Sequence, residues 1–189
     1  MGNWSETEIN NAALGLVGCQ RILNLSDAGN EAAACRFHWP LTREYVFTIH
    51  PWKCIGKQAT LSTTTTTPQF GHDYAYPLPA DFVRMISMDD SDDAYHVTGK
   101  ILHCDDSPAY IWYVPLETDA TKYDATLVQA LAFVQAYKLA LALRQDFQLA
   151  DGLQGHFERF WLPVIRHADT SRRGVRTVAS NSITDMFGM

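Results

Sequence analysis

The sequence predicts an α+β fold: a helical bundle built from N- and C-terminal helices, with an inserted small antiparallel sheet and an extended C-terminal tail. Apolar residues recur at helical spacing towards both ends of the chain, and short alternating runs between turn residues fill the middle. Beyond residue 170 both patterns stop and a polar, arginine-containing segment follows. We therefore expect a bundle from 1–56 and 118–170, a β arm at 57–117 and a docking tail at 171–189.

The N-terminal part of the bundle is expected to contain two helices. Ser5 and Glu8 form a capping-box pattern, and apolar residues follow at helical spacing. Ser26 and Asp27 are good N-cap residues, so a second helix is expected to begin after them. Pro40 lies inside this second helix and is expected to kink or interrupt it.

The middle of the chain is expected to form an antiparallel meander of three or four strands. Tyr74–Pro79 cannot be a central strand, because its two prolines remove ladder donors. The Thr63–Thr67 run is compatible with either a strand or a loop. Four short runs read as strands: Phe82–Met88, Tyr95–Thr98, Lys100–His103 and Ala109–Val114.

The segment from Asp124 to Arg144 is apolar around most of its helical circumference. Such a helix is buried on several sides, inside a bundle or between subunits. A further helix is expected from Gln148 or Asp151 to about Ala168. Four residues of the apolar helix are predicted to pack against neighbouring subunits: Leu127, Leu131, Val134 and Leu141.

Two aromatic residues beside prolines, Trp52 and Tyr76, are predicted to pack at the join between bundle and sheet. Charged residues make up 19% of the chain, below the usual ~25%, which suggests that a partner covers part of the surface. We expect that no apolar run approaches the ~18 residues of a membrane span, and we therefore predict no membrane partner.

Acidic residues are concentrated in the second and third quarters of the chain. Between His72 and Asp124 there are eleven acids against three bases, a net charge of −8. A domain that reads DNA sequence would carry a basic stripe instead. The three arginines of the tail are compatible with nucleic-acid binding and equally with docking on an acidic protein surface. With spaced apolar anchors beside them, we expect docking by the following residues: Arg172, Arg173, Arg176, Ile183 and Phe187.

Several residues could in principle carry chemistry. Cys35 with His38, and His50 with Cys54, have spacings that zinc sites use, although burial on a helix face explains them equally well. His103 and Cys104 are neighbours on a predicted strand, so their side chains point to opposite faces. We therefore predict no catalytic residue, no metal and no cofactor, and we keep a small cytosolic metal protein or enzyme as an alternative.

Taken together, several short segments of the sequence resemble the tail tubular protein A family, the head-to-tail adaptors of tailed bacteriophages. The resemblance extends over about Ile9 to Ala168 and leaves the threonine run and the tail unexplained. It rests on the following segments: Ile9–Gly15, Asn30–Cys35, Pro40–Glu44, His50–Trp52, Tyr74–Phe82 and the apolar helix near Ala130–Leu143.

The resemblance implies a structural protein of the virion neck, assembled in the host cytoplasm, and not an enzyme. Twelve copies would form a ring between the portal protein above and the tail nozzle protein below. Double-stranded DNA would pass through the ring during ejection without sequence recognition, which an acidic channel wall favours. Another neck protein, a stopper or a terminator, is the alternative within the same setting.

Overall fold

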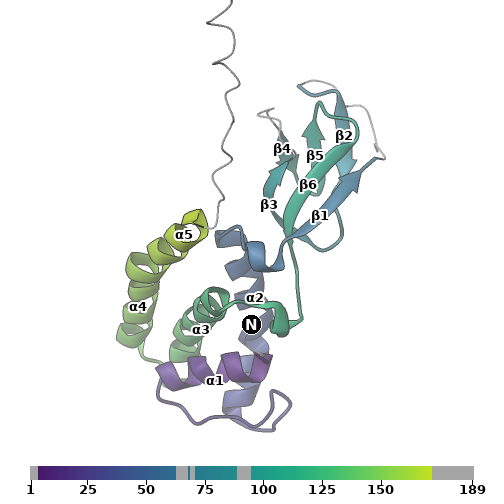
Figure 1. The fold of residues 1–189 in the computed structure, drawn as a ribbon. Coiled ribbons are helices and arrows are strands. Elements are labelled where there is room, and N and C mark those ends of the chain that lie inside the picture. Colours follow the sequence, from purple (N-terminus) through teal and green to yellow (C-terminus); the bar gives the residue numbers. More distant parts are fainter. Residues whose placement is uncertain (1–3, 63–67, 69–70, 89–94, 172–189) are drawn as a thin grey trace, which may run out of the picture.

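The computed structural model describes residues 4–62, 68, 71–88 and 95–171, and it confirms the α+β class. Helices form a body and the strands form an arm that projects from it (Figure 1). The helices are α1 (Glu6–Leu16), α2 (Asn30–Ile49), α3 (Ala125–Leu139), α4 (Phe147–His156) and α5 (Leu162–Ser171). The strands are β1 (Lys57–Leu61), β2 (Tyr74–Pro77), β3 (Phe82–Met88), β4 (His96–Thr98), β5 (Ile101–Cys104) and β6 (Ala109–Pro115).

Both N-terminal helices are present, with differences at their ends. The Ser5–Glu8 capping box opens α1 as expected. The N-cap of α2 is Gly29, so the expected cap at Ser26 and Asp27 was wrong. The Asp27 carboxylate instead accepts hydrogen bonds from backbone N–H groups of the preceding turn. Pro40 lies on the exposed side of α2, and the helix continues through it.

The arm consists of two three-stranded antiparallel sheets, of order β1-β6-β3 and β2-β5-β4. The sequence predicted four of these strands within one or two residues, but β1 was missed. β2 is an edge strand, which agrees with the exclusion of its prolines from a central position. Thr63–Thr67 lies outside the described residues.

The apolar helix α3 lies at the centre of the bundle, in contact with α1, α2 and α4 (Figure 1). Leu127 and Leu131 are fully buried and Val134 is 2% exposed, all within this single chain. These three residues therefore belong to the chain's own core, and the expectation that they contact neighbouring subunits was wrong. Leu141, in the π-helical continuation Ala140–Arg144, is 36% exposed.

By length and composition alone, Ala125–Arg144 could cross a membrane, with a mean hydropathy of 1.5. The expectation that no segment reaches this length was thus wrong. The protein itself buries 61% of the segment, and a core helix has the same composition. Burial among the other helices accounts for its apolar character.

A buried polar network ties three helices together. The amide nitrogen of Gln135 (α3) donates to Asn10 Oδ1 (α1) at 2.9 Å, and Thr42 Oγ1 (α2) donates to Gln135 Oε1 at 2.6 Å. All three side chains are fully buried, and Asn10 also donates to the Glu6 carbonyl oxygen. Because buried polar groups are costly unless paired, this network favours one register of the three helices.

The bundle and the arm share one core at their junction. Trp52, Ile55 and Val114 belong to the same buried cluster as the residues of α3, so Trp52 lies where expected. Tyr76 does not: it is fully buried among strand residues, including Leu102. Its position in β2, which pairs with β5, places it inside the arm and away from the join.

At the root of the arm, Asp81 links three segments. Its carboxylate accepts hydrogen bonds from Lys57 Nζ at 2.8 Å and from Tyr113 Oη at 2.9 Å, and its carbonyl oxygen accepts one from the Leu116 N–H. The hydrogen bond from Lys57, assisted by that from Tyr113, lowers the pKa of Asp81 against the opposing effect of burial. Burial and the contact with Asp81 raise the pKa of Tyr113 to about 12.

We expect Asp81→Asn to lower the free energy of unfolding by about 1 kcal/mol at pH 7, because these contacts are partly solvated. A carboxylate whose pKa is lower in the folded state stabilises the protein above its unfolded pKa, and this contribution is lost as pH falls through the folded pKa. The difference between wild type and variant should therefore shrink below about pH 4, measured by denaturant titration at several pH values. The control repeats Asp81→Asn in a protein that already carries Lys57→Met. There the loss of unfolding free energy at pH 7 should be smaller than in the wild type. An equal loss in the two proteins would show that the ion pair contributes nothing.

Candidate functional site

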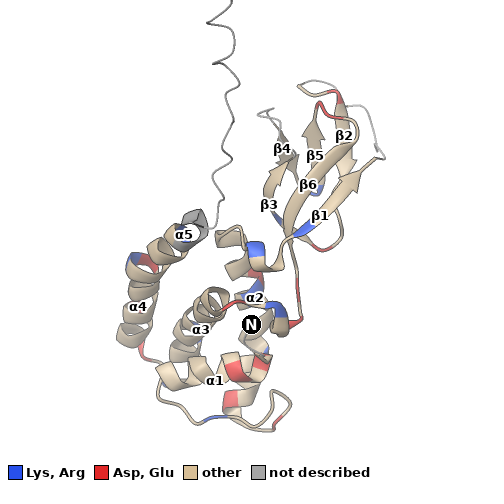
Figure 2. Ribbon diagram, viewed as in Figure 1, with Lys and Arg blue, Asp and Glu red and all other residues tan. Residues whose placement is uncertain are grey.

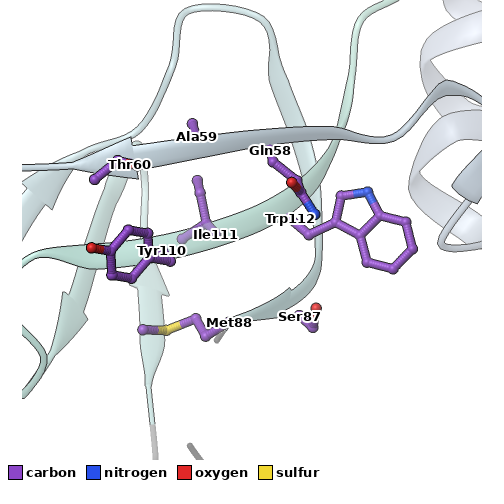
Figure 3. A pocket seen from close by; sticks show the side chains of 8 residues that line it. All are labelled: Gln58, Ala59, Thr60, Ser87, Met88, Tyr110, Ile111 and Trp112. Carbon is purple, nitrogen blue, oxygen red and sulfur yellow. The ribbon is translucent and has the colours of Figure 1, made fainter. Parts of the chain in front are cut away.

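A shallow hollow of about 480 Å³ lies on the first sheet (Figure 3). Tyr110 and Trp112 are two residues apart on the central strand β6, so both side chains project from the same face of the sheet. Eight residues from three strands line the hollow: Gln58, Ala59, Thr60, Ser87, Met88, Tyr110, Ile111 and Trp112.

The position of the Trp112 indole depends on a glycine. A Cβ built on Gly56 would lie 2.4 Å from Trp112 Nε1 and 3.0 Å from Ile86 Cδ1. The indole thus lies directly over the backbone that leads into β1, which requires glycine at that position. This packing fixes one wall of the hollow.

The hollow offers hydrogen-bonding groups and aromatic surface. The side chains of Gln58, Thr60, Ser87 and Tyr110 supply donors and acceptors. Among the described residues that line it, none is a histidine, cysteine, lysine or carboxylate that could act as a nucleophile or a general base. The lining side chains can supply hydrogen bonds and aromatic contact to a bound molecule.

Three histidines form a row on the second sheet: His103 in β5, His96 in β4, and His72 just before β2. His96 and His103 are cross-strand partners whose rings stack at 4.5 Å, and His72 lies 5.0 Å from His96. His72 also contacts an acid: its Nδ1 atom lies 3.3 Å from Asp105 Oδ1. The N–H of Asp73 and then His72 lower the pKa of the Asp105 carboxyl.

Sequence reasoning missed this row, although the signal was available. Gly99 has a φ of +62°, and Thr98 pairs with Ile101 around a two-residue turn. That register places residues 96 and 103 opposite one another. Among the described residues, no group of three or more His, Cys, Asp or Glu side chains is arranged to hold a metal ion.

The structure separates the residues of the alternative metal site. Cys35 is buried within α2, whereas His50 follows its last residue. Fifteen residues of helix span roughly 20 Å, so the Cys35–His38 pair and the His50–Cys54 pair cannot share an ion. Burial raises the pKa of the Cys35 and Cys54 thiols to about 11, as expected of structural cysteines.

His103 and Cys104 face opposite sides of β5, as predicted: Cys104 is 1% exposed, and His103 lies in the histidine row. The predicted docking residues lie outside the described part of the chain: Arg172, Arg173, Arg176, Ile183 and Phe187.

Large apolar side chains are exposed on two sides of the bundle. On α2, Phe37 is 73% exposed and Leu41 is 59% exposed; beyond α4, Phe160 is 62% exposed and Val164 is 55% exposed. The helical spacing of residues 37, 41 and 45 could have separated this second row from the core row.

Charges of both signs lie on the helices, and in the arm acidic residues lie at the far end and in the segments that join it to the bundle (Figure 2). Searches against models of known protein families and against curated protein sequences find no match to this chain.

Proposed function

We propose that this chain is a structural subunit of an adaptor ring in the neck of a tailed bacteriophage. The ring joins the portal protein to the tail nozzle and extends the channel through which double-stranded DNA passes. The proposal follows the resemblance of the sequence to tail tubular protein A, and the chain acts in it without catalysis.

One observation of the structure supports this proposal above the others: the bundle leaves large apolar side chains exposed on two separate sides. Phe37 and Leu41 lie on α2, and Phe160 and Val164 lie at the other end of the helical sequence. Contiguous exposed apolar surface is typical of protein–protein contact. A subunit with two such sides can contact two neighbours at once, which ring formation requires.

The charges are compatible with a DNA channel. The chain carries a net charge of −6, and acidic residues lie along the arm (Figure 2). A wall of the same sign as the phosphates disfavours sticking, whereas sequence-reading domains attract the backbone with lysines and arginines. The separation of Cys35–His38 from His50–Cys54 disfavours the alternative of a metal protein that uses all four.

The docking role of the tail gives a direct test of the neck proposal. We expect a variant that lacks residues 175–189 to keep its thermal midpoint, since the buried core of the described chain ends at Ile165. The same variant should lose attachment to portal-bearing heads, because it loses one of the three arginines and every apolar anchor of the tail. Attachment is scored by negative-stain imaging of heads mixed with full-length or truncated protein.

Arg172→Ala with Arg173→Ala is the matched partial variant and should weaken attachment without abolishing it. Full attachment by the truncated protein would contradict the docking role. Failure of the full-length protein to attach to portal-bearing heads would contradict the neck proposal itself.

A further inference from the structure

We infer that the exposed face of α2 in one copy of this chain docks on the outer face of α4 in the next copy, head to tail. The inference rests on the proposed ring and names the surfaces that close it. It depends on three features of the described residues: a row of projecting side chains, a hollow that can receive one of them and one pair of opposite charges.

The projecting row lies on α2. Phe37, Leu41 and Tyr45 are 73%, 59% and 47% exposed, and they are spaced four residues apart along one side of the helix. The opposite side of α2 carries Trp39 and Val46 into the core. α2 thus buries one face within the chain and presents a second apolar face to solvent.

The hollow lies on α4 and the π-helical segment Phe157–Trp161 that follows it. Its volume is about 260 Å³, and it is lined by Asp151, Gly152, Gly155, His156, Arg159 and Phe160. Glycine weakens a helix relative to alanine. A Cβ on Gly152 or Gly155 would meet no atom within 4 Å, so packing within the described chain does not require glycine at either position. Their effect is to deepen the hollow, which gives room for an aromatic side chain.

One charge pair is complementary across the two faces. On α2 the negative Glu44 lies beside the projecting row, and on α4 the positive Arg159 borders the hollow. Both side chains are exposed, and within the described part of the chain neither has an ion-pair partner. Arg36 lies on another side of α2, where its guanidinium donates to the carbonyl oxygens of Leu25 and Asp27. Two such helices side by side and parallel place Glu44 against Arg159.

The arrangement of the bundle provides this parallel alignment. α2 and α4 both run from the end of the bundle remote from the sheets towards the sheets, and α3 lies between them (Figure 1). A neighbour related by a small rotation about a ring axis keeps its α2 nearly parallel to the α4 that it meets. Because the two faces differ, the contact is heterologous, and repeating it closes a ring when the rotation between copies is a whole fraction of a turn.

Charge reversal tests the contact. Glu44→Arg and Arg159→Glu each place like charges opposite one another, so each variant alone should associate at least tenfold more weakly than wild type in mass photometry. Mixed together, the two variants restore an opposite pair at every contact and should form particles of wild-type mass. The double variant in one chain should also assemble.

A wild-type chain that stays monomeric, or a mixture that associates no better than its components, would overturn the docking of α2 on α4. The outcomes separate this inference from the neck proposal. Rings that form normally from both single variants would overturn this contact and leave the adaptor ring standing. Rings that depend on the charge pair but do not attach to portal-bearing heads would support the contact and contradict the neck role.

Filling the hollow gives an independent test. Gly155→Leu should weaken association at least tenfold, because the new side chain occupies the space for the neighbour. Leucine favours a helix over glycine, so the thermal midpoint of the monomer should be unchanged or higher. Gly15→Leu on α1, where a Cβ also meets no atom within 4 Å, is the matched control and should not change association. Unchanged association of Gly155→Leu would overturn the proposed contact.

Discussion

Leu131→Asp is expected to lower the free energy of unfolding by about 4 kcal/mol or more. Leu131 is fully buried on α3, in the cluster that also contains Phe47 and Trp52. The substitution removes apolar volume and places a carboxylate in a cluster of buried apolar side chains. Chemical denaturation monitored by circular dichroism measures the loss directly, and an unfolded variant under native conditions agrees with the prediction.

Gln129→Asp is the matched control, since the same change of charge occurs on the exposed side of the same helix. It should change stability by less than about 0.5 kcal/mol. A stable Leu131→Asp protein with a normal midpoint would contradict the central position of α3 in the bundle.

Trp52→Ala is expected to cost about 3–5 kcal/mol. Trp52 is 3% exposed at the junction of bundle and arm, and its Nε1 donates to the Val46 carbonyl oxygen at 2.7 Å. The variant leaves a cavity and removes the hydrogen bond to the Val46 carbonyl oxygen. Thermal and urea unfolding of the purified variant measure the cost.

Trp52→Phe separates the two contributions, because it keeps most of the ring but removes the donor. Its expected cost is smaller, about 1–3 kcal/mol, from the lost hydrogen bond and the reduced volume. If Trp52→Ala left the urea midpoint unchanged, the shared core between bundle and arm would be wrong.

The sequence predicted those parts of the fold that local patterns specify. Phe82–Met88 has the same bounds in the structure, and the capping box at Ser5 opens α1. Both depend on residues near one another in the chain. β1 was missed because Lys57–Leu61 has little apolar alternation, and its strand conformation depends on pairing with β6, about fifty residues later.

The sequence could not tell which protein surface covers an apolar helix. The pattern of α3 is the same whether its partners are helices of its own chain or of a neighbour. Leu127 and Leu131 are covered by the chain itself, whereas Phe37 and Leu41 on α2 are among the large apolar residues left exposed. To tell burial by the chain's own helices from burial by a neighbouring subunit, one must know how helices that are distant in the sequence pack together.

The central claim is that this chain assembles into a closed ring as a structural subunit. Negative-stain imaging with class averages of the purified full-length chain tests it most directly, with mass photometry giving the particle mass. The account predicts a closed ring of about twelve subunits, twelve times the 21.3 kDa of the chain, with the β arms on one side. A stable monomer, or a twofold-symmetric dimer that buries the same face of both copies, would contradict it.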